Sequence, residues 1–337
     1  MTAQPTLPGD AGEVAELLLP PDIAPENVHP LPIGRTLALC GETMGTGWSL
    51  TAVAPQDVSP ERIEGSLLAV FDTIIAQMSQ WAPESEISRF NRGATGSRHA
   101  ISPQFRIVLD QALKIARMSD GAFDPALGRA SAAWGFGAAP SPMAIPEEGD
   151  LTRPHGWQAI AFDEDGALLQ PGGLQLDLSG IAKGFAVDMG LAALRRHGVE
   201  HALLEIGGEL GGVGVQAVGL PWWVDIEVPP GSDAPTARVA LSGWAVATSG
   251  SYRRRREIAG VSWSHSLDPE SGRPLDDEVL SVTVLGKLCM EADALATAIN
   301  VLGRQAGMGF AEWHDIPARM VTDKETITST AWRAWLN

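Results

Sequence analysis

Residues 176–198 read LDLSGIAKGFAVDMGLAALRRHG, and this stretch carries the local features from which the fold is predicted. The alternating leucines of 174–178 predict a strand, and Ser179 and Gly180 predict a turn after it. Small and apolar residues then recur every three or four positions, which predicts a helix over 181–197. A strand, a tight turn and a helix should therefore follow one another directly.

The start of this helix is a candidate anion site. The first turn of a helix presents free N–H groups and the positive end of the helix dipole, and Lys183 lies in that turn. This combination suits the pyrophosphate of a dinucleotide. The residues alone leave a plainer alternative open, which is an ordinary strand–turn–helix unit with a solvated lysine.

A second helix, predicted over 291–304, carries hard oxygen ligands on one face. Asp293 and Thr297 are one turn apart, so their carboxylate and hydroxyl groups point the same way. Oxygen ligands with room left for phosphate oxygens and water are what Mg²⁺ requires. The alternative is that these residues only form the polar face of an amphipathic helix.

A third segment, WSHSLDPESGRP at 263–274, contains a tight turn after a short strand. His265 precedes that turn and is a candidate base for a hydroxyl nucleophile, with an ordinary pKa of about 6.5 if unperturbed. A structural histidine is the alternative. The four arginines at 253–256 resemble a phosphate clamp, but alternation on a strand would send them to both faces, which favours a solvated edge.

The rest of the chain predicts an α+β fold, because mostly antiparallel strands alternate with occasional helices. The proline-rich range 1–35 is expected to be a loosely attached leader, and 36–337 the folded domain. Further helices are predicted at 60–79 and 102–119. Strands are predicted from 37, after 46, and at 202–206, 224–228, 237–241 and 280–285.

The overall charge and the missing motifs exclude several functions. The formal net charge of the 337 residues is −17, which repels nucleic-acid phosphates, so a phosphate ligand needs a local cation or a metal. No G-x-G-x-x-G follows a strand, and no P-loop or G-x-S-x-G elbow occurs. The chain shows no export signal and no long apolar run, so we expect a cytoplasmic protein without stable membrane insertion.

Eight sequence blocks in a fixed order resemble the ApbE family of FAD:protein FMN transferases. The blocks are Met44-Gly45-Thr46, MSQWAPESEISRFN from Met78, GAFDP at 121–125 with WGFG at 134–137, DLSGIAKGFAVD at 177–188, IGGEL at 206–210, ATSGSYRR at 247–254, SHSLDPESGRP at 264–274 and EADALATA at 291–298. The chain departs from the family's pattern at Trp81, where tyrosine is common. It also departs at Ala296, where some members have a second acidic residue.

The resemblance implies an architecture, a set of ligands and a reaction. The architecture is α+β, with two similar subdomains related to the T-fold and FAD between them. FAD would be held by Met44, Trp81, Ala122, Phe123, Asp124, Asp177, Lys183 and Leu267, and Mg²⁺ by Gly180, Asp293 and Thr297. The reaction would move FMN from FAD to a Thr or Ser hydroxyl of an acceptor flavoprotein and release AMP.

Within that reaction His265 is the candidate base, and Asp268 is its alternative or its orienting partner. Two other functions remain open at this point. Water can replace the acceptor, which gives a metal-dependent FAD pyrophosphatase that produces FMN and AMP. The chain can also be a flavin-binding protein without turnover, although a storage protein does not need a metal at the scissile bond.

Overall fold

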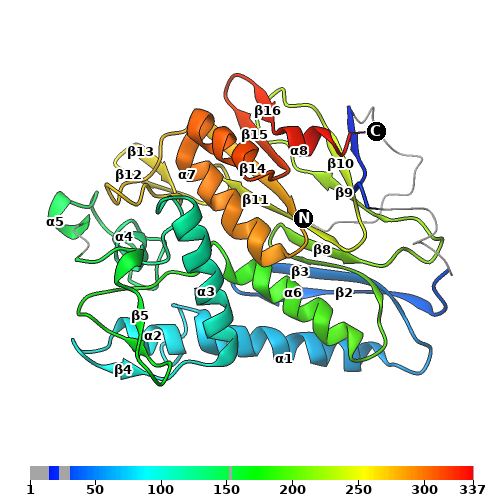
Figure 1. Ribbon diagram of the computed structural model, residues 1–337, viewed down its shortest axis with the longest axis horizontal. Coiled ribbons are helices and arrows are strands. Elements are labelled where there is room, and N and C mark those ends of the chain that lie inside the picture. Colours follow the sequence, from blue (N-terminus) through cyan, green and yellow to red (C-terminus); the bar gives the residue numbers. More distant parts are fainter. Residues whose placement is uncertain (1–14, 23–30, 152–153, 337) are drawn as a thin grey trace.

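The computed structural model describes residues 15–22, 31–151 and 154–336, and an eight-stranded sheet forms its centre (Figure 1). All neighbouring strands of this sheet pair antiparallel. From one edge to the other they are β16 (Thr326–Thr328), β15 (Ala318–Thr322), β14 (Val279–Gly286), β11 (Trp244–Gly250), β8 (Glu209–Val213), β7 (His201–Ile206), β3 (Thr46–Ala54) and β2 (Arg35–Thr43).

Long helices cover one face of the large sheet (Figure 1). They are α1 (Pro60–Met78), α6 (Ala182–Arg195) and α7 (Cys289–Trp313), and α3 (Pro103–Met118) packs mainly against α7 and α1. Ser59 caps α1 and Ser102 caps α3, and a proline follows each cap in the first turn. The apolar faces of the helices and one face of the sheet share the main hydrophobic core.

A small three-stranded sheet covers the opposite face. It consists of β1 (Glu16–Leu18), β10 (Ala237–Leu241) and β9 (Trp222–Ile226). These strands form a second apolar cluster, to which the short helix α8 (Thr330–Arg333) contributes Trp332. β1 runs parallel to β10, and Leu18 is fully buried. This part of the range expected to be a loose leader is therefore packed on the domain. The ranges 1–14 and 23–30 lie outside the described residues, and the boundary at 36 stays a prediction.

Glycines on β8 let both layers approach the large sheet. A Cβ on Gly211 would lie 2.8 Å from the Leu191 side chain of α6, and a Cβ on Gly212 would lie 2.6 Å from Leu241 of β10. Such distances are shorter than van der Waals contact allows, so any larger residue would push a layer away. The glycines of this strand thus serve packing on both faces.

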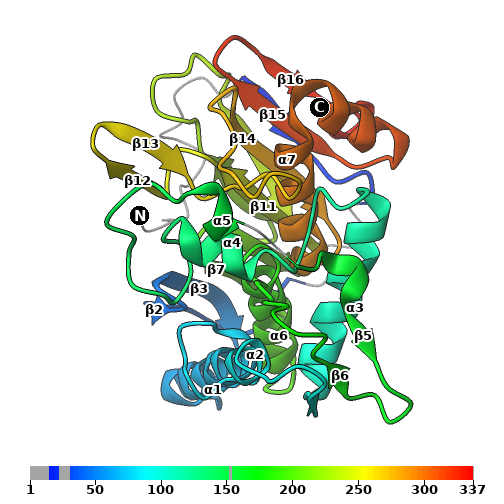
Figure 2. The same cartoon turned by 90° about the vertical axis from the view of Figure 1, so that its left-hand side faces the viewer.

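Smaller elements surround the end of the sheet where α4 and the β12–β13 hairpin lie (Figure 2). They are α2 (Glu86–Asn91), β4 (Arg98–His99), α4 (Gly128–Ala133), α5 (Glu148–Leu151), a 3₁₀ turn (Trp157–Ala159), β5 (Ala161–Phe162), β6 (Leu168–Leu169), β12 (Arg255–Ile258) and β13 (Val261–Ser264).

The prediction of a strand over 174–178 is wrong. Its leucines are buried, which explains the alternation, but the backbone pairs with loops and a side chain instead of a neighbouring strand. The amide of Asn91 donates to Leu176 O at 2.9 Å and accepts from Leu176 N at 2.7 Å. Gly128 N donates to Gln175 O at 3.0 Å. The segment is an extended connection that leads directly into the turn before α6.

Candidate functional site

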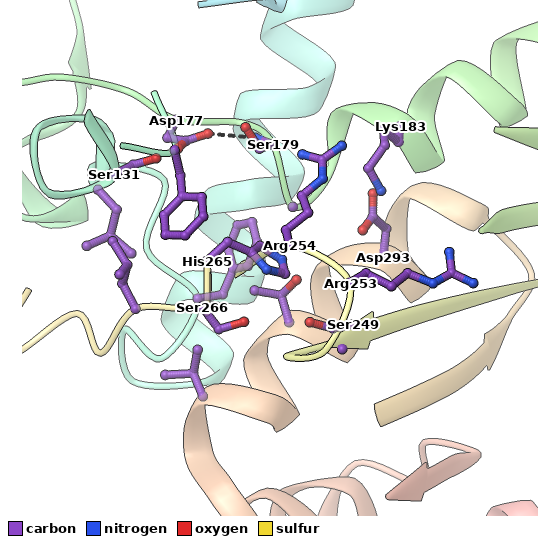
Figure 3. A pocket seen from close by; sticks show the side chains of 18 of the residues that line it. Ser131, Asp177, Ser179, Lys183, Ser249, Arg253, Arg254, His265, Ser266 and Asp293 are labelled. Atoms are coloured by element: carbon purple, nitrogen blue, oxygen red, sulfur yellow. Dashed lines mark hydrogen bonds between the residues drawn. The ribbon is translucent and has the colours of Figure 1, made fainter. Parts of the chain in front are cut away.

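Two adjoining pockets bring together most of the residues predicted for the site, and Figure 3 shows the polar one. The polar pocket has a cavity volume of about 180 Å³, and the more apolar pocket one of about 510 Å³. Ser179, Lys183 and Arg254 line both pockets, so the two adjoin, and together they are called the groove, with each pocket as one lobe. The predicted residues that line the polar pocket are Ala122, Phe123, Asp124, Asp177, Gly180, Lys183, His265, Leu267, Asp293 and Thr297.

The turn of the hairpin between β2 and β3 forms part of the wall of the apolar pocket. Met44 and Gly45 have φ values of 50° and 72°, which suits the two-residue turn of a tight hairpin. Met44 lines the pocket together with Ile74 and Met78 of α1 and with Trp81, whose side chain is half exposed. These residues form a surface suited to a flat aromatic ring.

The turn between 177 and 182 forms as the sequence predicts. Ser179 N donates to Asp177 Oδ1 at 2.9 Å, and Ala182 N donates to Leu178 O at 2.9 Å, after which α6 begins. Lys183 lies in the first turn, and its Nζ pairs with Glu209 Oε2 at 2.5 Å. Both side chains are largely buried, so this is an internal ion pair and not a solvated lysine.

Burial raises the pKa of Glu209 to about 7, against the opposing effect of the Lys183 charge. Burial opposes the charge of Lys183 as well, but the carboxylates of Glu209 and Asp293 together raise its pKa above the usual value. The lysine is therefore charged at neutral pH. Glu209 lay within a quoted sequence block, but nothing in its spacing indicated that it would meet Lys183.

Asp293 and Thr297 of α7 face the turn at Gly180. Asp293 Oδ2 accepts a hydrogen bond from Gly184 N at 3.1 Å, and a Cβ on Gly180 would lie 3.1 Å from Thr297 Oγ1. Only 5% of Asp293 is exposed, so its face of the helix is buried and not a solvated polar face. Burial raises the pKa of Asp293, while Lys183 opposes that shift.

These residues fit a magnesium ion by the chemistry of their donors. A carboxylate, a hydroxyl and the main chain at Gly180 converge on the polar pocket, and all three supply hard oxygen atoms. In the described ranges no group of three or more His, Cys, Asp or Glu side chains can hold a metal. A metal at this place would therefore have one carboxylate ligand. Its other ligands would be neutral oxygen atoms of the protein or would come from a bound molecule, such as phosphate oxygens.

His265 also lines the polar pocket and lies across it from Asp293 (Figure 3). Its backbone N–H donates to Arg254 O at 3.2 Å, and its ring meets the Phe136 ring edge-on. Burial, followed by the charges of Arg254 and Lys183, lowers the pKa of His265 from 6.5 to about 4. The imidazole is therefore neutral at neutral pH and able to accept a proton.

Asp268 lies outside the lining of both pockets. Its carboxylate accepts hydrogen bonds from Glu270 N at 3.0 Å, Ser271 N at 3.1 Å and Ser271 Oγ at 2.6 Å, all within its own turn. This geometry braces the 268–272 turn, which leads back from the pocket wall. It gives no support to Asp268 as the base or as the partner that orients His265.

The expectation that the four arginines form one solvated edge is wrong for two of them. β12 begins only at Arg255, so Arg253 and Arg254 lie in the preceding turn and both line the polar pocket. Arg255 pairs with Asp277 at 2.7 Å, and Arg256 donates to Ser141 Oγ at 2.8 Å. The alternation argument failed because the strand starts two residues later than assumed, and Gly250-Ser251 was the available signal for that break.

Known proteins match this chain over most of its length. The model of the ApbE family matches residues 44–320. The chain belongs to the ApbE family. The FAD:protein FMN transferase of Vibrio cholerae is 34% identical, over 84% of this chain and 86% of that protein. The enzyme of the same name from Haemophilus influenzae is 30% identical, over 88% and 90%.

Solved structures of the ApbE family share the fold. The flavin transferase ApbE from Vibrio cholerae superposes with a TM-score of 0.82 at 31% identity, over 90% of this chain and 99% of that one. The flavinyl transferase ApbE of Pseudomonas stutzeri in its apo form gives 0.81 at 32% identity, over 90% and 97%. These matches confirm the predicted α+β class, the family resemblance and the assignment of the chain as a transferase.

Proposed function

We propose that this ApbE-family chain transfers FMN from FAD to a Thr or Ser hydroxyl of an acceptor flavoprotein and releases AMP. The observation that carries the proposal is a single polar pocket in which the Asp293–Thr297 pair, the buried Lys183 and a neutral His265 face one another. The relatives named FAD:protein FMN transferase support it.

The two lobes of the groove support a dinucleotide such as FAD as the ligand. A dinucleotide has two flat ring systems joined through a diphosphate, and the groove has two lobes that join at Ser179, Lys183 and Arg254. We propose that Met44 and Trp81 contact one ring system and Phe123 and Leu267 the other. The diphosphate would then cross the junction at the start of α6, where free N–H groups favour an anion.

Asp293, Thr297 and the main-chain carbonyl of Gly180 would hold Mg²⁺ in this proposal. The bound ion would neutralise charge on the diphosphate, as metals do in phosphoryl transfer generally. The protein's own contribution is to fix those ligands. The hydrogen bond from Gly184 N holds the Asp293 carboxylate in one orientation, and the packing of the Gly180 turn on Thr297 holds the hydroxyl beside it.

The transfer step requires a base. The acceptor oxygen forms a bond to the phosphorus on the FMN side, and the bond from that phosphorus to the bridging oxygen breaks. AMP leaves with the electron pair of that bond, and His265 accepts the proton of the acceptor hydroxyl. The neutral imidazole has a free lone pair at neutral pH, and the negative charge of a bound diphosphate would offset Arg254 and Lys183 and raise the lowered pKa of His265 toward the range in which a base is effective.

Water in place of the acceptor would make the same site an FAD pyrophosphatase. Nothing in the polar pocket distinguishes the two nucleophiles, because the base and the metal ligands serve both. The flavin-storage alternative has less support, since binding alone does not require a neutral base beside the Asp293–Thr297 pair. No helix in the described ranges is long and apolar enough to span a membrane, and the cytoplasmic location stays a prediction.

The decisive experiment incubates the protein with FAD, Mg²⁺ and an extract of the cells that produce it. Covalent transfer predicts a protein band other than this chain with flavin fluorescence that survives denaturing electrophoresis, together with AMP in equal amount. An Asp293→Asn variant is the matched control and should give neither. Release of FMN and AMP without a fluorescent band would establish the pyrophosphatase instead, and no turnover at all would leave only flavin binding.

A further inference from the structure

We infer that Arg254 is a substrate-binding residue that supplies the free positive charge for the FAD diphosphate. This inference rests on the proposed function, because that function provides the ligand. Among the residues that the structure describes, Arg254 is the only arginine that lines both lobes of the groove. In Figure 3 its side chain extends toward the Ser179 turn and Lys183, where the two lobes join.

The other cations of the groove are already paired. Lys183 forms the buried ion pair with Glu209, and Arg253 forms an ion pair with Glu227. Within the described ranges, no carboxylate lies within ion-pair distance of the Arg254 guanidinium. Arg254 is therefore the cation of this groove whose charge and donors are available to a ligand.

Neighbouring groups show that the Arg254 charge acts inside the pocket. It lowers the pKa of His265 and opposes the charge of Lys183, both of which lie on the pocket walls. Three cationic side chains meet here in a chain whose net charge is −17. The charges of Lys183 and Arg253 are offset by Glu209 and Glu227, so Arg254 is the charge that remains for a diphosphate to neutralise.

The chemistry of the guanidinium matches the diphosphate. Its planar fork of N–H donors can bond two oxygens at once, which a lysine ammonium cannot do. The Arg254 backbone is held in place because its carbonyl accepts the hydrogen bond from His265 N. The same residue thus links the position of the base to the position of the diphosphate.

The test compares FAD with riboflavin, which has the flavin ring and no phosphate. Binding is measured by calorimetry or flavin fluorescence in the presence of a chelator, so that no metal contributes. Arg254→Gln should weaken FAD binding by ~10–100-fold, the loss expected for hydrogen bonds to a charged group. Riboflavin binding should change by less than about twofold, since no charge–charge contact is lost. Arg254→Lys should fall between, because it keeps the charge and loses the fork.

Arg255→Gln is the matched control. It removes the same charge from the adjacent residue, which pairs with Asp277 and lines neither pocket, so FAD binding should stay near the wild-type value. Unchanged FAD binding in a folded Arg254→Gln protein would overturn the inference. An equal loss of riboflavin binding would also overturn it, because Arg254 would then only shape the pocket. Failure of the wild type to bind FAD would instead reject the proposed function.

Discussion

His265 shows how the surroundings of one residue set its chemistry. Burial and two nearby cations lower its pKa to about 4, whereas its sequence alone suggested the ordinary value of about 6.5. We therefore expect the ¹³C-labelled imidazole signal that disappears in His265→Gln to titrate near pH 4 in the ligand-free protein. A midpoint near 6.5 would show that the ring is solvated and that Arg254 and Lys183 do not act on it.

The lowered pKa of His265 should also make the stability of the protein depend on pH. The folded-state pKa is depressed, so the unfolded chain binds a proton before the folded chain does. The free energy of unfolding should decrease as the pH falls from about 6.5 toward 4, and this loss should be smaller in His265→Gln. Denaturant titrations of both proteins at several pH values test this. Parallel pH profiles for the two proteins would contradict it.

The role of His265 as a base predicts a loss of rate without a loss of binding. His265→Gln can still hydrogen-bond but cannot accept the proton, so transfer should fall by ~10²–10⁴-fold while FAD affinity changes little. Single-turnover rates and FAD titrations separate the two effects. Near-normal transfer would move the proton to Asp268 or to a group on the acceptor, and the hydrogen bonds that Asp268 accepts from Ser271 in its own turn favour the acceptor.

Asp293 should be tested by replacement with asparagine, because replacement with alanine would also destabilise the fold. A solvated polar face would tolerate alanine, but Asp293 is buried and accepts the Gly184 N–H. Asp293→Ala leaves that donor unsatisfied, which costs ~1–3 kcal/mol of stability. Asp293→Asn retains an acceptor, so it should fold normally and lose the response to Mg²⁺. Thr297→Val should be milder, because water can replace a neutral ligand. Full Mg²⁺ stimulation of the Asn variant would reject the ligand assignment.

At the scale of elements, two helical glycines predict opposite outcomes. A Cβ on Gly184 of α6 would lie 2.4 Å from Cys289 O, where α7 begins, so Gly184→Ala should separate the two helix starts. We expect a loss of ~1–3 kcal/mol of stability, typical of overpacking, together with weaker FAD binding. Gly65 of α1 has no atom within 4 Å of its Cβ position, so Gly65→Ala should stabilise by ~0.5–1 kcal/mol. Thermal unfolding of both variants distinguishes a packing effect from a general one.

The elements that the sequence predicted best are those whose pattern reflects one local cause. The helices at 60–79 and 102–119 were correct within a few residues because serine caps and apolar periodicity both mark them, and the helix at 181–197 was correct because of its periodicity and the Ser179-Gly180 turn before it. The 174–178 strand was wrong because buried alternation says nothing about the partner, which here is the Asn91 side chain. The helix predicted to end at 304 continues to Trp313 through a kink at Gly303, whose φ is 74°.

The candidate site also has one part that the sequence predicted and one part that it did not. Residues carried by a sequence block converge in space, because the blocks end strands or begin helices at one end of the large sheet. The ion pair of Lys183 with Glu209 and the inward position of Arg254 depend on how separate segments pack. Glu209 and Arg254 both stand in matched blocks, but spacing along one segment has no information about contacts between segments.

At the scale of the whole molecule, the two faces of the large sheet serve different purposes. The apolar cluster of β1, β9, β10 and α8 shares no residue with the lining of either pocket. The helix-covered face instead includes Phe123, which belongs both to the main core and to the polar pocket. Stability and binding should therefore respond separately to changes on the two faces.

Leu18 of β1 tests this separation. The side chain is fully buried against β10, and Leu19 N donates to Trp335 O at 2.7 Å, so the strand joins both ends of the chain to one cluster. Leu18→Ala should lower the free energy of unfolding by ~2–4 kcal/mol, as for other buried leucines. FAD affinity of the folded variant should stay within about twofold of wild type, because no residue of this cluster lines the groove. Leu68→Ala, at a leucine of α1 that is 39% exposed, is the control and should change stability by ~0.5 kcal/mol or less. Denaturant unfolding and FAD titration of the same samples decide the matter. A loss of FAD affinity that accompanies the loss of stability would show that the two faces are coupled through the sheet.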